Sequence, residues 1–158
     1  MAHTKHDIEL PTEFSGPGQL ILYTRYGDPR EPGWDNKWLA TWHVQERFPW
    51  FPKNDICIHK HFRSMLEKAF AELALYDLYK EIKTYDGCYR QHDMEGSRSV
   101  LSLHAWGAAI DMNAEDNPNG AAGKWSNEFL QVMEKNGIFC GQNWIGRKDP
   151  MHFAMVNG

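Results

Sequence analysis

Residues 59–85 read HKHFRSMLEKAFAELALYDLYKEIKTY, and this segment sets the expected class of fold. Its apolar side chains recur at three- and four-residue intervals, the period of one buried helix face. The segment therefore predicts a long helix, which ends at Asp86-Gly87. The apolar positions on that face are Phe62, Met65, Leu66, Ala69, Phe70, Leu73 and Tyr76.

A second helix and several short strands are expected after it. Ser126 as N-cap and Gly137 just past the last turn delimit a shorter apolar helix. Strand-like pieces occupy residues 108–113, 138–140 and 151–156. Helices separated from short strands predict an α+β domain, with a short antiparallel sheet and helices packed to one side.

The N-terminal third is less regular in sequence. The run QLILYTRY, Gln19 to Tyr26, predicts a strand, and turn-rich pieces follow it. Residues 1–50 are therefore expected to form an irregular wrap. The sequence has no internal repeat and no linker, so residues 1–158 are expected to form a single domain.

Composition excludes several classes of partner. The net charge is -4 and no run of Lys or Arg exceeds two, which argues against binding to nucleic acid or an anionic membrane. The N-terminus has no apolar core of a secretion signal, and no stretch of about 18 apolar residues predicts a membrane span. The three cysteines, Cys57, Cys88 and Cys140, form no CxxC pair and are expected to be buried thiols.

Two segments carry residues suited to metal chemistry: SLHAWGAAIDMN at 102–113 and DPMHF at 149–153. The two imidazoles and one carboxylate of His104, Asp111 and His152 suit Zn²⁺, and three protein ligands leave a fourth position for water, as in catalytic zinc sites. Asp149 lies three residues before His152 and is the candidate general base. Gly107 would allow a close backbone approach between the first two ligands.

These segments resemble the zinc peptidases of the D-alanyl-D-alanine carboxypeptidase and L-alanyl-D-glutamate endopeptidase family. That family carries S-x-H-x-x-G-x-A-x-D followed by E/D-x-x-H, and every fixed position is matched here. The resemblance covers roughly residues 55–155. It implies a fold of the type shared by these peptidases and the Hedgehog signalling domain, with zinc as cofactor.

The resemblance also implies an arginine that stabilises the oxyanion, upstream of the first histidine. Arg90 is the candidate, although relatives often place this arginine about two residues later, where this chain has His92. Arg98 is the second candidate. Ser102 matches a family serine and is expected to support the site or contact substrate.

Several other aromatic, histidine and acidic side chains lie near these motifs or have compositions typical of sites. Trp106 and Trp144 are close to the motifs in sequence; Trp106 is the predicted substrate contact. His59 and His61 are two residues apart, where helix faces do not meet, and are predicted not to be ligands. The acidic and amide-rich segment 115–120 lacks calcium-loop spacing and is predicted to be a solvated loop.

The expected function is hydrolysis of an amide bond in the peptidoglycan stem peptide. Without a secretion signal, a monomeric phage endolysin is expected, held in the cytoplasm of the host bacterium and acting on the cell wall after release. One alternative is a D-alanyl-D-alanine carboxypeptidase, and another is a non-catalytic, Hedgehog-like zinc-containing binding domain. A phage tail component that opens the wall would use the same residues.

Overall fold

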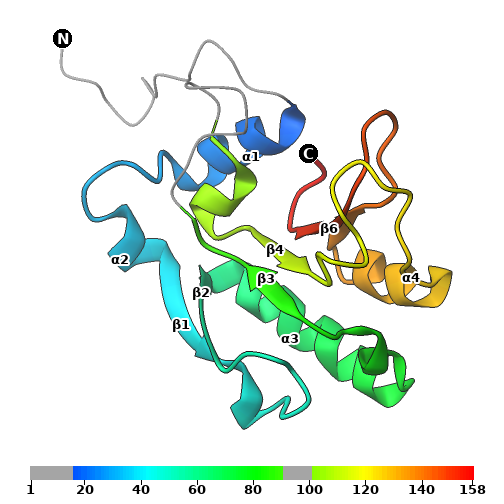
Figure 1. Ribbon diagram of the computed structural model, residues 1–158. Coiled ribbons are helices and arrows are strands. Elements are labelled where there is room, and N and C mark those ends of the chain that lie inside the picture. The colour runs from blue at the N-terminus through cyan, green and yellow to red at the C-terminus, as the bar shows by residue number, and fades with distance from the viewer. Residues whose placement is uncertain (1–15, 91–100) are drawn as a thin grey trace, which may run out of the picture.

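The computed structural model describes residues 16–90 and 101–158, which form an α+β domain (Figure 1). The α-helices are α1 (Pro17–Tyr26), α2 (Trp34–Trp38), α3 (Lys60–Leu75) and α4 (Asn127–Lys135). The strands are β1 (Leu39–His43), β2 (Asp55–His59), β3 (Tyr85–Gly87), β4 (Ala109–Met112), β5 (Phe139–Gly141) and β6 (Asp149–Ala154). Short 3-10 helices are η1 (Val44–Glu46), η2 (Leu78–Glu81) and η3 (Leu103–Trp106).

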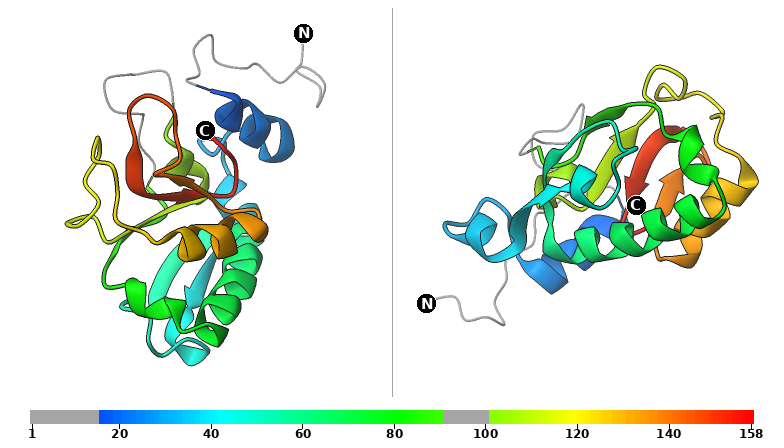
Figure 2. Two further views of the ribbon diagram at one scale, coloured as in Figure 1. Left: turned by 90° about the vertical axis from the view of Figure 1, so that its right-hand side faces the viewer. Right: turned by 90° about the horizontal axis from the view of Figure 1, so that it is seen from below.

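The strands form two antiparallel sheets. One pairs β1 with β2, and the other has the order β3-β4-β6-β5. Helix α3 contacts β1, β2 and α4, while α4 contacts β5. Seen from below, α3 crosses in front of the larger sheet (Figure 2, right), and the C-terminus lies beside α1 (Figure 1). The predicted α+β class and short antiparallel sheet are confirmed.

Helix α3 is shorter than the sequence predicts. It buries Phe62, Leu66 and Leu73 on one face, as the spacing indicates, but it ends at Leu75 rather than near Tyr85. The reason is Asp77, whose φ of 59° is left-handed and cannot continue an α-helix. The chain resumes as η2 and then enters β3.

The second predicted helix and the later strands are confirmed. The Ser126 side chain caps α4 by accepting a hydrogen bond from the Phe129 N–H, and Gly137 follows with a φ of 80°. The apolar runs predicted as strands form β4, β5 and β6.

The strand predicted at Gln19–Tyr26 is wrong, because these residues belong to α1. Pro17 occupies the first turn, where its fixed φ favours a helix, and the buried residues Gln19, Leu22 and Tyr23 have helical spacing. Residues 34–43 form α2 and β1, so the region 16–50 is an integral part of the fold rather than an irregular wrap.

Two further expectations from the sequence concern the burial of the cysteines and the presence of membrane-spanning helices. Cys88 and Cys140 are buried, whereas Cys57 is exposed, so the prediction of three buried thiols is wrong for Cys57. Within residues 16–90 and 101–158, no helix is both long and apolar enough to cross a membrane.

Candidate metal centre

An open cavity of about 1090 Å³ lies beside β4 and β6. Its walls come from α1, η3, α4, the strands β4 to β6 and the loops that join them. Most of the predicted site residues line it, including all three candidate ligands and Asp149. The lining side chains used below are those of Arg90, Ser102, His104, Asp111, Asn119, Trp144, Arg147, Asp149 and His152.

His104 is held in place by η3 and by a backbone carbonyl. The Ser102 hydroxyl accepts a hydrogen bond from the His104 N–H at 3.2 Å and so caps η3. The His104 Nδ1 lies 2.7 Å from the Cys88 carbonyl oxygen. Because a carbonyl can only accept, Nδ1 carries the proton, and the lone pair is on Nε2. This arrangement is typical of metal-binding histidines, whose second nitrogen is fixed by a hydrogen bond.

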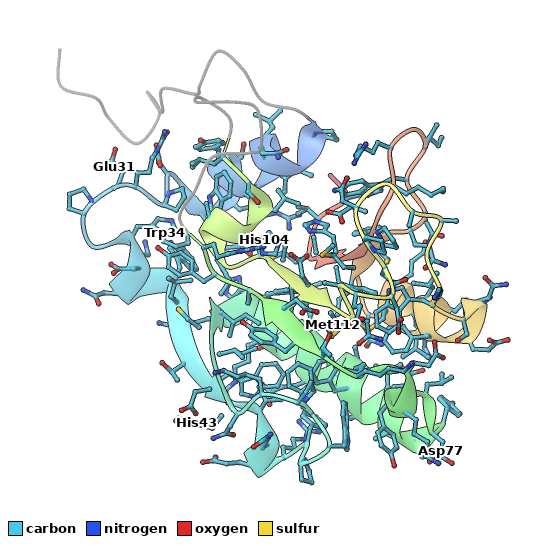
Figure 3. The ribbon with its side chains drawn as sticks, viewed as in Figure 1. Glu31, Trp34, His43, Asp77, His104 and Met112 are labelled. Carbon is cyan, nitrogen blue, oxygen red and sulfur yellow. The ribbon has the colours of Figure 1, made fainter. Side chains whose placement is uncertain are left out.

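The sheet brings the other two candidate ligands together. Asp111 on β4 is paired directly with His152 on the antiparallel β6. His104 Nε2 lies 3.2 Å from Asp111 Oδ2, and His152 Nδ1 lies 3.5 Å from Asp111 Oδ1. In Figure 3, the labelled His104 and Met112 mark the segment that runs from η3 to the end of β4. The ligand atoms of the three residues all lie within 4.8 Å of one another.

These three residues fit a zinc ion. Ligand atoms about 2.0–2.1 Å from a tetrahedral zinc lie about 3.3 Å apart, between the two separations that involve Asp111. All three side chains are buried. Asp111 Oδ1 has no hydrogen-bond partner among the described residues, although a buried carboxylate oxygen normally has one. The same nitrogen and oxygen ligands also suit other divalent ions.

The charges around Asp111 keep it ionised. Burial alone would raise its pKa, but the imidazoles of His104 and His152 beside the carboxylate outweigh burial and hold the pKa well below its usual value. Arg90 adds a hydrogen bond from Nη2 to Asp111 Oδ2 at 2.9 Å. The candidate ligand is thus a carboxylate at neutral pH.

Asp149 lies at the start of β6, and its side chain faces the same cavity. Its Oδ1 is buried without a hydrogen-bond partner among the described residues. Burial raises the pKa of Asp149, partly opposed by the nearby His152. A carboxyl with a raised pKa beside candidate metal ligands is suited to accept and release a proton.

The predicted arginine and tryptophan have different outcomes. Arg90 contacts the candidate ligand Asp111, while the alternative Arg98, like His92, lies outside the described residues. Trp106 is fully buried, donates its indole N–H to the Gly27 carbonyl oxygen and does not line the cavity. It has no surface to offer a substrate.

Trp144 lines the cavity instead, and its ring lies 5.4 Å from that of His152. Its closeness to the second motif in sequence was the signal for this position. Asn119 and Arg147 also line the cavity, and sequence reasoning missed both. Asn119 belongs to the segment that was predicted to be a solvated loop.

His59 and His61 are placed away from the candidate ligands. His59 is buried among aromatic rings, where its Nδ1 accepts a hydrogen bond from the His61 N–H. Burial lowers the pKa of His59 to about 4. His61 pairs with the Tyr26 hydroxyl at 2.8 Å. Neither belongs to the His104, Asp111 and His152 group.

Comparison with known proteins supports the same chemistry. No curated protein and no solved structure matches the chain. Residues 95–155 match the family model described as D-alanyl-D-alanine carboxypeptidase. The matched segment contains Ser102, the three candidate ligands and Asp149, but not Arg90. The segment that builds most of the candidate metal centre is therefore similar to zinc peptidases of the D-alanyl-D-alanine carboxypeptidase family.

Proposed function

We propose that this protein is a zinc-dependent peptidase that hydrolyses an amide bond in the peptidoglycan stem peptide. The observation that carries the proposal is the convergence of His104, Asp111 and His152 in a cavity that also holds Asp149. Three ligands with a neighbouring carboxylate are typical of a catalytic zinc site rather than a structural one. The family match at residues 95–155 supports a peptidase.

Each side chain then has a role in amide hydrolysis. Bound zinc would supply a Lewis acid that polarises the carbonyl and activates water. The Asp149 carboxylate takes a proton from the attacking water and passes it to the leaving amine. The Arg90 guanidinium lies next to the metal ligands and donates to the oxyanion that forms at the scissile carbonyl. Ser102 holds η3, and with it His104, in place.

The proposal also assigns the peptidase a role in lysis of the bacterial cell wall. The aspartate at position 149, where other members of the resembled family carry glutamate, is the residue that phage endolysins of this kind tend to show. We infer that the protein acts on the bacterial cell wall after release from the cytoplasm of the host. Purified protein added to isolated cell walls should then reduce their turbidity, and failure to do so would contradict a lytic role.

Mass spectrometry of purified peptidoglycan fragments tests the proposed reaction. The fragments are incubated with zinc-loaded wild type, with Asp149→Asn and with Asp116→Asn, which changes a partly exposed carboxylate that pairs with Lys83 and does not line the cavity. New peptide cleavage by the wild type and Asp116→Asn, but not by Asp149→Asn, is the expected result. The products also identify the bond, because release of free D-alanine alone indicates a carboxypeptidase.

A non-catalytic, Hedgehog-like binding domain is the second candidate, favoured by the burial of all three candidate ligands. It predicts that the wild type binds zinc stoichiometrically and cleaves nothing. Zinc content measured on the same preparations separates this outcome from simple loss of metal.

A further inference from the structure

Arg147 presents an unused hydrogen-bonding edge at the cavity wall. It lies in the loop between β5 and β6, and its Nε donates to the Asn119 Oδ1 at 2.5 Å. Its two terminal nitrogens make no hydrogen bond or ion pair with any residue in 16–90 or 101–158. Arg90, the other arginine in the wall formed by these residues, already donates to Asp111.

Asn119 fixes where the Arg147 side chain lies relative to the proposed base. A guanidinium can only donate, so the amide oxygen of Asn119 faces Arg147 and its NH₂ group faces away. The Asn119 side chain also lies close to Asp149, where it lowers the pKa of that carboxyl. Asn119 thus neighbours both groups, and all three residues line the same cavity.

The backbone beneath Arg147 is shaped for this position. Gly120 donates its N–H to the Lys148 carbonyl oxygen at 2.7 Å, which joins the two loops. A Cβ on Gly120 would lie 3.2 Å from Arg147 Nη2, so the glycine lets the guanidinium lie close to the backbone. Lys148 is engaged elsewhere, because its ammonium group donates to the carbonyl oxygens of Gln142 and Trp144.

We propose that Arg147 binds a free carboxylate on the substrate residue next to the scissile amide. Arginine binds carboxylates through two parallel N–H groups, and the terminal edge of Arg147 has both available. Arg147 and Asp149 line the same cavity, and consecutive Cα atoms are about 3.8 Å apart, so a substrate residue adjacent to the bond served by Asp149 lies on the same wall as this edge. The assignment of a scissile amide rests on the function proposed above.

Two matched pairs of peptides test this assignment. The first pair is L-alanyl-γ-D-glutamyl-L-lysine with the D-glutamate α-carboxylate free or amidated. The second is a stem peptide that ends in D-alanyl-D-alanine, with the terminal carboxylate free or amidated. Both pairs are given to zinc-loaded wild type, Arg147→Gln and Arg63→Gln. Arg63 is the control because its Nε is also hydrogen-bonded, to Glu67, but it does not line the cavity.

Within the pair that is cleaved, wild type and Arg63→Gln should show a kcat/KM about tenfold higher for the carboxylate peptide than for the amidated peptide. A factor of this size is expected from one exposed charge-assisted contact. Arg147→Gln should lose this preference by slowing the carboxylate peptide alone. Equal losses on both peptides, or no preference in the wild type, would overturn the assignment while leaving the peptidase proposal intact.

If the wild type cleaves neither pair, the proposed function fails and the same proteins are titrated calorimetrically with the same peptides. A preference of about tenfold in Kd that Arg147→Gln removes would then support a carboxylate-binding site. Equal affinities for carboxylate and carboxamide in the wild type would refute it.

Discussion

Replacing Gly107 with alanine tests how closely the segment that carries His104 must approach β2. Gly107 ends η3 with a φ of 65°, and its carbonyl oxygen accepts a hydrogen bond from the His59 N–H at 3.1 Å. A Cβ at this position would lie 2.7 Å from the His59 backbone nitrogen and 2.9 Å from Leu39 Cδ2. Atoms of the backbone cannot give way as the end of a flexible side chain can.

The expected loss of stability combines two terms. A left-handed φ costs a residue with a Cβ about 1–2 kcal/mol. Overpacking against fixed backbone adds about 1–3 kcal/mol. The free energy of unfolding of Gly107→Ala should therefore fall by about 4 kcal/mol, which corresponds to a Tm lower by about 10 °C for a chain of this size.

Gly33→Ala is the matched control for this variant. Gly33 has a φ of 81°, but a Cβ there would meet nothing within 4 Å. It should show the backbone term alone, a loss of about 1–2 kcal/mol. Urea unfolding of both variants gives the difference. Losses that agree within about 0.5 kcal/mol would show that the contact with His59 and Leu39 imposes no restraint on η3.

Three further outcomes are expected. Zinc at about 100 times its Kd should raise the free energy of unfolding of the wild type, measured by calorimetry, by about 2.7 kcal/mol. A chelator should remove this gain, and so should His152→Ala. An equal gain in His152→Ala would contradict the assignment of His152 as a ligand. Burial lowers the pKa of His59 to about 4, so on acidification the unfolded chain takes up this proton first. Its contribution to stability is therefore complete above about pH 6.5 and is lost as the pH falls through about 4. Between pH 6.5 and pH 4, the free energy of unfolding measured with urea should fall by up to about 3 kcal/mol more in the wild type than in His59→Asn, which keeps a side-chain acceptor for the helix cap. Parallel pH profiles of the two proteins would refute this. In the native protein a thiol reagent should modify the exposed Cys57 rapidly. Cys88 and Cys140 should react only after unfolding, because both are buried and burial raises the pKa of each thiol. Rapid reaction of all three cysteines would show that the native core opens.

The secondary structure could be predicted where burial repeats with one clear period. Helix α4 has both a capping serine and a terminal glycine, and its position was predicted closely. Helix α1 was mistaken for a strand because its run of apolar residues has no distinct helical stripe. Tertiary burial of Leu22 and Tyr23 decided its conformation instead. The early end of α3 depends on the left-handed φ of Asp77, a local choice that spacing does not reveal.

The candidate ligands could be predicted from sequence, but their supporting contacts could not. The Cys88 carbonyl that orients His104 and the amide of Asn119 beside Asp149 both come from segments without a motif. Backbone carbonyls have no sequence signature, and an asparagine before a glycine usually indicates only a turn. Such contacts become visible when the loops are seen packed around β6.

The register between β4 and β6 explains why one residue in a short apolar strand indicated the site. All residues of β4, Ala109 to Met112, are buried, so no alternation of polar and apolar side chains reveals which face each one occupies. An aspartate in such a strand has a high desolvation cost unless it is paired. Its partners, His104 and His152, come from outside the strand, one through η3 and the other through direct pairing with Asp111. The buried carboxylate therefore predicts that positive groups or a metal ion gather around it, and the fold brings two imidazoles to that position.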